Sequence, residues 1–532
     1  MDIAITKTID GDKLTLCLAG RLDKLTGSAF DAEFRAAAEG AKEAVLDFSK
    51  LDYLSSAGIR SLIMANNQMK KQGGTLTVKN PTADVMDVFE MTNLGRLLHI
   101  VKDGDTEETN APEYYPLRPI QRWLVDTHLQ KANSTMMNIG ALMRLDPSVD
   151  MERMAEAVND VISTYDIFRC RLLFHPETGE VCQRFDGEVA RVYVETLSDE
   201  AFEKRKRDLM EPYTLIDRPL YRVHLMKTAS GQYLYADFYH AIMDGVATAL
   251  LFRRELDKRY VRGAGNAAVR KAPSYAEYVL AESMLAPETL AEGHAYWRKM
   301  LEGFDEKRHL PPADVEGVGA WTKNEIEISL ESVVPQDFFK NADCSENTFF
   351  MAATMLAMAK SAGAKESIMS WVHNGRMNSM EHRMLGLMLN QIPIRWDFEE
   401  GLSTGAFLRG LEARIAEGMK YIKSLDVVYD EGLENNCATF ILQKGLTSRR
   451  GGARLGGAEA EIVQMPENGR SAAENTLDID CNAHADGTHS LVLNYDASRY
   501  SVEAMRRFAR TVDEMIGALT DEKRQVAELL ES

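Results

Sequence analysis

The sequence lacks the features that would place it in a membrane, in the secretory pathway or on nucleic acid. Its first residues, MDIAITKTID, have neither the basic start nor the apolar stretch of a signal peptide. No uncharged apolar run approaches the roughly 18–20 residues that a membrane-spanning helix needs. The net charge of −19 would repel nucleic acids and anionic lipids. We therefore expect a cytoplasmic protein that binds neither nucleic acid nor membrane.

Cysteine and histidine are also sparse, and neither is arranged as a metal site. The 6 cysteines are widely spaced and form no Cys-x-x-Cys pair, which favours reduced, buried thiols over a disulfide scaffold or a zinc site. The Gly-rich stretch GGARLGG (451–457) has no Lys-Ser/Thr, so we expect a mobile loop there and not a phosphate-binding loop. No metal and no permanently bound cofactor is expected.

A break in composition divides the chain. At 532 residues it is too long for one hydrophobic core. Residues 102–117, KDGDTEETNAPEYYPL, are acidic and contain proline without apolar periodicity, as in a solvated linker. We assign residues 1–103 to a first domain, 104–113 to an acidic linker and 114–532 to a second domain.

The first domain alternates strand and helix patterns. Residues 43–51 form a buried apolar strand, and a helical pattern follows that begins at Ser55-Ser56 and ends at Gly73-Gly74. Another strand pattern, TLTVKN, comes next. Such alternation over about a hundred residues predicts a small α/β domain. Ser55 and Ser56 have the residue type and position of helix N-caps.

Residues 1–103 resemble the STAS family of the anti-sigma-factor antagonist type. The resemblance rests on GRLD, LDFSKLDYLSSAGIRSLI and VFEMTNLGRLLHI. It implies that a partner serine kinase phosphorylates the matching position, Ser56, which switches binding off, and that a phosphatase reverses the change. Ser55 stands where the family often has Asp. The alternative is that both serines act only as N-caps.

The second domain mixes helices and paired strands, so we expect an α+β fold large enough for two lobes. Residues 220–228 and 232–244 alternate as a hairpin, and 245–260 form an amphipathic helix. Residues 348–363 form a Met-rich buried helix that ends at a glycine. The sequence His240-x-x-x-Asp244-Gly245 lies where the hairpin turns into the helix, which makes it the candidate site.

Residues 114–530 resemble the condensation domains of nonribosomal peptide synthetases, in the chloramphenicol-acetyltransferase-like superfamily. The ordered motifs are PLRPIQRWL, STYDIFRCRL, EPYTLIDRPLYRVHL, YHAIMDG, SYAEYV, GRMNSMEHRMLGLMLNQIPIR and FILQ. The resemblance implies two lobes, about 114–285 and 286–532, with His240 in a tunnel between them. A phosphopantetheine-linked acyl donor and an amine acceptor would enter from opposite faces.

The same resemblance implies a role for each site residue. His240 would orient or deprotonate the nucleophile, and the backbone of Gly245 would help to hold the oxyanion. Asp244 would form an ion pair, with Arg376 as the candidate partner. Asn390 and Gln391 would belong to a loop at the floor of the tunnel. Tyr239 stands where condensation domains usually have a first histidine, although simpler acyltransferases of the superfamily keep only the second.

These features predict a stand-alone condensation-type acyltransferase that carries a phosphoswitch domain. No carrier or adenylation region is recognisable, so we expect acyl groups to arrive in trans, on an acyl or peptidyl carrier protein or as CoA thioesters. The main alternative is a regulatory protein whose second domain only docks an acyl carrier, with His240 as a buried structural residue. A sigma-factor regulator with an incidental appendage is a third possibility, which requires a kinase encoded nearby.

Overall fold

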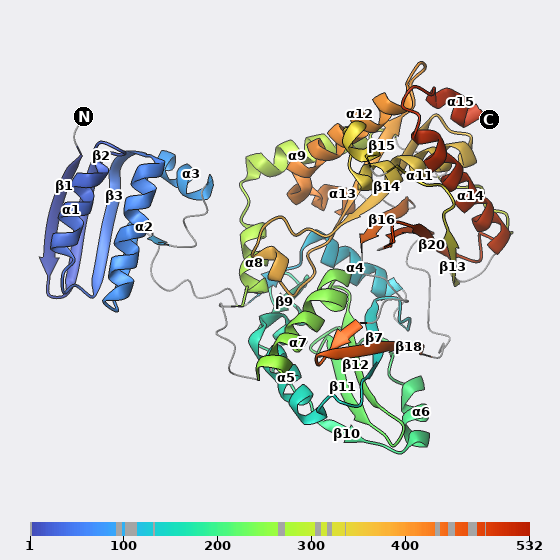
Figure 1. Cartoon of the computed structure of the whole chain (residues 1–532), viewed down its shortest axis with the longest axis horizontal. Coiled ribbons are helices and arrows are strands. Elements are labelled where there is room, and N and C mark those ends of the chain that lie inside the picture. The colour runs from blue at the N-terminus through green and yellow to red at the C-terminus, as the bar shows by residue number, and fades with distance from the viewer. Residues whose placement is uncertain are drawn as a thin grey trace. The chain divides into compact units, whose positions relative to one another are not determined.

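The computed structural model forms two compact units, Met1–Glu113 and Tyr114–Ser532 (Figure 1). It describes residues 3–91, 98–101, 114–130, 133–263, 272–303, 310–316, 322–335, 337–430, 437–444, 453–465, 476–484 and 486–531. Side chains of Ser56, Ala83, Asp87, Glu90, Met91, Gln130 and Ala453 are not described. The predicted acidic linker, 104–113, lies outside the described residues.

The first unit is an α/β domain built on one five-stranded sheet in the order β1-β2-β3-β4-β5. Strands β1 and β2 pair antiparallel, and the other neighbours pair parallel. The sequence did not signal the first and last strands. The elements are β1 (Ala4–Asp10), β2 (Lys13–Leu22), α1 (Gly27–Ala37), β3 (Glu43–Leu54), α2 (Ser56–Lys71), β4 (Thr75–Lys79), α3 (Ala83–Met91) and β5 (His99–Val101).

The first lobe of the second unit is a six-stranded sheet in the order β10-β11-β12-β7-β18-β17. A three-stranded sheet, β6-β9-β8, accompanies it. The strands are β6 (Tyr115–Pro116), β7 (Asn138–Leu145), β8 (Arg171–Phe174), β9 (Val181–Arg184), β10 (Val194–Thr196), β11 (Tyr221–Lys227), β12 (Gln232–Tyr239), β17 (Ala453–Leu455) and β18 (Ala458–Val463). The helices are α4 (Pro119–Gln130), α5 (Met151–Thr164), α6 (Asp199–Arg207), α7 (Arg253–Arg262) and α8 (Tyr275–Ser283).

The second lobe is another six-stranded sheet, in the order β13-β20-β19-β16-β14-β15. Its strands are β13 (Lys323–Ser329), β14 (Glu366–His373), β15 (Asn390–Asp397), β16 (Ala438–Lys444), β19 (Leu477–Ala483) and β20 (His489–Asp496). Its helices are α9 (Pro287–Leu301), α10 (Phe338–Asn341), α11 (Glu346–Ala362), α12 (Thr404–Gly418), α13 (Asp426–Asp430), α14 (Val502–Leu519) and α15 (Val526–Glu531).

The predicted Met-rich buried helix is α11, and the prediction is confirmed. Ser345 caps its first turn by accepting a hydrogen bond from the amide of Thr348. Every residue from Thr348 to Ala359 is buried, and the helix ends at Gly363, whose φ of 61° is left-handed. A helix that is apolar all round needs cover on several sides. The second sheet, α12, α14 and α15 pack against α11.

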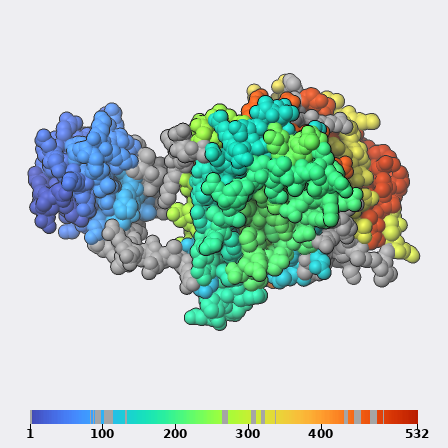
Figure 2. Space-filling view, turned by 90° about the horizontal axis from the view of Figure 1, so that it is seen from below, coloured from blue at the N-terminus to red at the C-terminus, as the bar shows by residue number. Residues whose placement is uncertain are grey.

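A crossover hairpin links the two lobes. Strands β17 and β18 come late in the chain, yet β18 pairs antiparallel with β7, so that Glu461 lies opposite Arg144. In Figure 1 the orange-red β18 lies beside the blue-green β7 of the lower lobe. In Figure 2 the face turned to the viewer is formed largely by residues of the first lobe, in green and blue-green. Because of this exchange, a single boundary near residue 285 does not separate the two sheets.

The same hairpin corrects the expectation of a mobile loop at 451–457 for residues 453–457, while Gly451 and Gly452 lie outside the described residues. Residues 453–455 are a strand, and Gly456 and Gly457 turn the chain with φ of 70° and 80°. Two adjacent glycines with positive φ suit a two-residue hairpin turn between paired strands. The glycines therefore mark a tight turn, which the sequence analysis interpreted wrongly as a loop.

Neither a membrane-spanning helix nor a metal-binding cluster is present in the described ranges. No helix there is long and apolar enough to cross a lipid bilayer. Within the same ranges no group of three or more His, Cys, Asp and Glu side chains is placed to hold a metal ion.

Candidate functional site

The candidate site lies at the end of β12, where backbone hydrogen bonds fix the chain. All eight residues of β12 are buried between β11 and β7. The amide of Tyr239 donates to the carbonyl of Leu220 at 2.9 Å, and that of His240 donates to Met137 at 2.8 Å. A tight turn follows, in which the amide of Ile242 donates to the carbonyl of Tyr239. His240 thus stands on a rigid strand end.

His240 is a half-buried histidine with a perturbed pKa. Its Nδ1 is buried and has no hydrogen-bond partner among the residues that the structure describes. Burial lowers the pKa of the imidazole, and the nearby carboxylate of Asp244 only partly opposes this effect. A histidine with a lowered pKa is neutral at pH 7 and can accept a proton.

Asp244 is held by hydrogen bonds on both carboxylate oxygens. Its Oδ1 accepts from the amide of Ala247 at 2.7 Å, as an N-cap does. Its Oδ2 accepts from Arg376 Nη1 and from the amide of Met388, each at 2.8 Å. The expected ion pair with Arg376 is therefore present, with side chains that are 1% and 2% exposed. These bonds occupy the carboxylate, so Asp244 is poorly placed to take a proton.

Arg376 lies in the loop after β14 and has hydrogen-bond partners besides Asp244. Its Nη2 donates to the carbonyls of Met384 and Gly386 at 3.2 and 3.3 Å. Gly375, with a φ of 68°, lies against the same stretch, Met384 to Met388. A Cβ built on Gly375 would lie 1.7 Å from the carbonyl oxygen of Met388. The loop and the segment therefore meet backbone to backbone, and this second-lobe contact secures the Asp244 turn.

Gly245 begins the helix that follows the turn. It is exposed, and a Cβ built on it would meet no atom within 4 Å. The first amides of a helix have no partner within the helix and can bind an anion. Residues Ala247–Phe252 form a π-helical turn before α7. Such turns are often found at functional sites, and the sequence analysis did not predict this one.

Tyr239 faces the core and not the turn. The ring is fully buried, and the hydroxyl donates to the carbonyl of Leu124 in α4 at 3.5 Å. Its ring packs edge-on against His128, with 5.4 Å between centroids. The side chain at this position therefore packs beneath α4.

Asn390 and Gln391 are the first two residues of β15, so the expectation that they belong to a loop is wrong. The residues just before them, together with Asn390, form what we call the bridge segment, Met384–Asn390. Asn390 Nδ2 donates to the carbonyl of Met388 at 3.4 Å, and its Oδ1 accepts from Arg118 at 3.3 Å. Asn390 thus supports the same segment that Asp244 and Arg376 bind.

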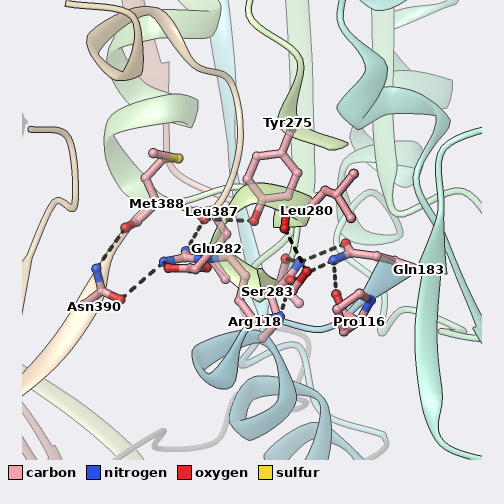
Figure 3. Close-up of polar contacts among 12 residues, drawn as sticks. Pro116, Arg118, Gln183, Tyr275, Leu280, Glu282, Ser283, Leu387, Met388 and Asn390 are labelled. Carbon is pink, nitrogen blue, oxygen red and sulfur yellow. Dashed lines mark hydrogen bonds and ion pairs between the residues drawn. The ribbon is translucent and has the colours of Figure 1, made fainter. Parts of the chain in front are cut away.

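Two polar residues near the start of α4 were missed. Gln121 is fully buried and donates to the carbonyl of Ala241, the residue after His240, at 2.8 Å. Arg118 is buried and reaches the bridge segment (Figure 3). Both lie in PLRPIQRWL, which served only as a family motif. No local pattern shows that an arginine before a helix is buried.

The second predicted site is at the start of α2 in the first unit. Ser55 is the N-cap, and its Oγ accepts a hydrogen bond from the amide of Gly58 at 3.4 Å. The prediction that Ser55 is a cap is therefore confirmed. Ser56 is the first residue of α2, and its side chain is outside the described part of the structure.

Comparisons with known proteins agree with the two folds. Residues 5–101 match the family model described as "Mlab, STAS domain", so the first unit is a STAS domain. Tyrocidine synthase 3 of Brevibacillus parabrevis is 22% identical over 551 residues, 96% of this chain and 8% of that protein. Surfactin synthase subunit 1 of Bacillus subtilis (strain 168) is 22% identical over 495 residues, 88% of this chain and 13% of that protein. The chain thus spans a small part of each relative's length.

Solved structures share the fold of the second unit. The starter condensation domain of rhizomide synthetase has a TM-score of 0.63 at 16% identity, covering 78% of this chain and 98% of that one. The X-domain in complex with OxyB from teicoplanin biosynthesis has a TM-score of 0.66 at 15% identity, covering 79% and 96%. These are chloramphenicol-acetyltransferase-like folds with mixed sheets. The condensation-domain model matches residues 112–530, and the chain belongs to the condensation-domain family.

Proposed function

We propose that the second unit is an acyltransferase that forms an amide or ester from a thioester-linked acyl group. The observation that carries this proposal is the state of His240, whose pKa is lowered by burial and whose backbone is fixed at a strand end. A general base needs a neutral form at working pH and a fixed position. The fully bonded carboxylate of Asp244 leaves the imidazole as the base of this turn.

In the proposed reaction His240 accepts the proton of an acceptor amine or alcohol as its nitrogen or oxygen attacks the thioester carbonyl. The new C–N or C–O bond forms, and the C–S bond then breaks. The thiol leaves with the proton that His240 returns, so the imidazole ends neutral. In this proposal the backbone amide of Gly245, which is exposed at the helix start, donates to the oxyanion.

The acyl group in this proposal comes on the phosphopantetheine of a carrier protein or on CoA. The matched relatives are synthases of the tyrocidine and surfactin type. A mutant of the rhizomide starter domain was solved in complex with C8-CoA and Leu-SNAC. Both observations support a thioester donor and an aminoacyl-type acceptor for this chain. No step above needs a metal or a resident cofactor.

For the STAS domain we propose a phosphoswitch at Ser56, set by an anti-sigma-type serine kinase and reset by a phosphatase. The helix begins at Ser56, and a helix N-terminus tolerates phosphate well because its free amides and positive dipole face the added charge. The phosphate would change the local surface without breaking the helix.

A binding protein without catalysis is the second candidate. Tyr239, where a first histidine is usual, favours it, since the buried ring makes only core contacts. The X-domain complex with OxyB adds support, because a protein of this fold is there bound to another protein. In this reading the second unit docks a carrier and His240 has no reaction to perform.

Acyl transfer by His240→Ala separates the two candidates. The full chain is incubated with acylated carrier protein or acyl-CoA and a set of amines, and products are followed by mass spectrometry. Loss of a general base should reduce the rate about a hundredfold. The control is His294→Ala, because the imidazole of His294 pairs with the carboxylate of Asp426 and not, among the described residues, with a residue of the turn. Carrier binding by wild type without any product would leave the binding protein, and equal rates for the two variants would remove His240 as the base.

A further inference from the structure

The bridge segment, Met384–Asn390, is bound from two sides. On one side Asp244 accepts a hydrogen bond from the amide of Met388. On the same side Arg376 donates hydrogen bonds to two carbonyls of the segment. On the other side Arg118 Nη1 donates to the carbonyl of Leu387 at 2.6 Å. The hydroxyl of Tyr275 donates a second hydrogen bond to the same carbonyl at 2.9 Å. The peptide between Leu387 and Met388 therefore connects Arg118 to the turn that carries His240.

Arg118 is itself firmly held. Its Nε and Nη2 donate to the two oxygens of Glu282 in α8, and the side chains are 2% and 14% exposed. Burial alone would lower the pKa of the guanidinium, but the charge of Glu282 raises it well above its ordinary value. A two-pronged arginine–carboxylate pair fixes direction as well as charge. Figure 3 shows Arg118 between Glu282, Leu387 and Asn390.

The start of α4 also reaches the turn directly. The amide of Arg118 donates to Gln121 Oε1 at 2.9 Å, and Gln121 Nε2 donates to the carbonyl of Ala241. Gln183 completes this group by exchanging hydrogen bonds with Gln121. Two paths thus run from Arg118 to the His240 turn, one through Gln121 and one through Leu387, Met388 and Asp244.

We propose that Arg118 is a positioning residue for His240. Arg118 joins the bridge segment of the second lobe to the start of α4 in the first lobe. Both parts are thereby held at a fixed distance from the His240 turn. The inference rests on the proposed function of His240 as the base. Small displacements of a catalytic group cost much rate, since a shift near 1 Å can lower it about a hundredfold. Loss of Arg118 should therefore affect turnover more than substrate binding.

The test compares Arg118→Gln with Arg122→Gln in the full chain. Arg122 is a matched control, since it lies in α4, four residues after Arg118, and joins Asp430 of the second lobe at 2.7 Å, but is half exposed. Two readouts are used: kcat and KM for acyl transfer, and the rate at which diethyl pyrocarbonate modifies His240, measured by peptide mass spectrometry. His294 serves as an internal reference for the second readout.

We expect Arg118→Gln to lower kcat about tenfold or more, with KM within about twofold of wild type. The modification rate of His240 should change at least about threefold while that of His294 stays constant. Arg118→Lys keeps the charge without the fork and should recover only part of the loss. Arg122→Gln should match wild type in every readout.

Wild-type kcat and wild-type His240 reactivity in Arg118→Gln would overturn the inference, as would equal effects of Arg122→Gln. If Arg118→Gln does not fold, Glu282→Gln takes its place, because it keeps the shape of the partner and removes its charge. Unchanged readouts in that variant would also overturn the inference. If wild type transfers no acyl group, the proposed function fails, and the reactivity of His240 still decides the positioning role.

Discussion

The two candidate sites share one local design and differ in what surrounds it. In each unit a buried strand ends, a small polar residue caps a helix, and the helix starts at a residue proposed to act. Ser55 caps α2 with one hydrogen bond of 3.4 Å to Gly58, three residues ahead. Asp244 caps with a bond of 2.7 Å to Ala247 and holds two further partners more than 130 residues away.

The difference indicates what each turn can do. Long-range partners on both sides make the Asp244 turn rigid, as a general base requires. The Ser55 cap has a local side-chain bond, and its backbone is tied to β2 by the bond from its amide to Leu22. In the described part of the domain, its side chain binds the amide of Gly58 and no buried charge. A site for reversible modification needs this kind of turn, in which an added group does not break the fold.

Removing the carboxylate of Asp244 should have the largest effect. Asp244→Ala leaves Arg376 as a buried cation without its partner, which costs about 3–5 kcal/mol in the free energy of unfolding. Hydrogen exchange of β12 amides in the full chain measures this for the second unit alone. Asp430→Ala is the control, because it breaks an exposed pair worth about 0–1 kcal/mol. Equal protection in both variants would show that the buried pair does not stabilise the turn.

The dependence of acyl transfer on pH should come next in size. The pKa of His240 lies below its ordinary value of 6.5 because of burial. The neutral, proton-accepting form therefore persists through pH 7, and the rate should stay level from about pH 8 down to about 6.5. Below the lowered pKa the rate should fall about tenfold per pH unit. A profile of kcat against pH that already falls above pH 7 would contradict the lowered pKa.

The sequence predicted features with local signals. The strand before His240, the buried helix α11 and the cap at Ser55 all follow from periodicity and residue type. The pairing of Asp244 with Arg376 came from the family resemblance, and it is present. The strand, the helix and the cap need no knowledge of how distant segments meet, whereas the ion pair is a long-range contact that only the resemblance supplied.

Other features that depend on long-range contact were missed. β18 pairs with β7, which lies more than 300 residues earlier in the chain. When read alone, the short strands of the β17–β18 hairpin and their glycines resemble a loop. Arg118 precedes a helix at Pro119 and has the local pattern of an exposed charge. Only tertiary contact with Glu282 and Leu387 shows that it is buried. The placement of Asn390 in a loop came from the family resemblance and not from the local pattern, and Asn390 is the first residue of β15.

Loss of the Ser55 cap should have a modest effect. Ser55→Ala removes one long hydrogen bond to the amide of Gly58, which should cost about 0.5–1 kcal/mol. Faster hydrogen exchange confined to the first turn of α2 is the expected result. Ser55→Asp restores an acceptor and should restore protection. If Ser55→Ala unfolds the whole STAS domain, the cap matters far more than one bond, and the contrast with Asp244 is wrong.

Phosphorylation of Ser56 should change the fold least of all while it changes binding. The STAS domain is nearly neutral, so a group with close to two negative charges would dominate the local field, yet the dipole at the start of α2 favours that charge. Protection of the α2 amides should therefore stay within about 0.5 kcal/mol of the unmodified chain.

Phosphoproteomics of the native organism tests the position, and titration with a purified anti-sigma-type kinase tests the switch. Ser56→Asp should weaken kinase binding, whereas Ser55→Asp should weaken it less, since Ser55 is occupied as the cap. Modification confined to other residues, or full binding by Ser56→Asp, would leave the start of α2 as a structural cap, with no regulatory counterpart to the rigid turn at His240.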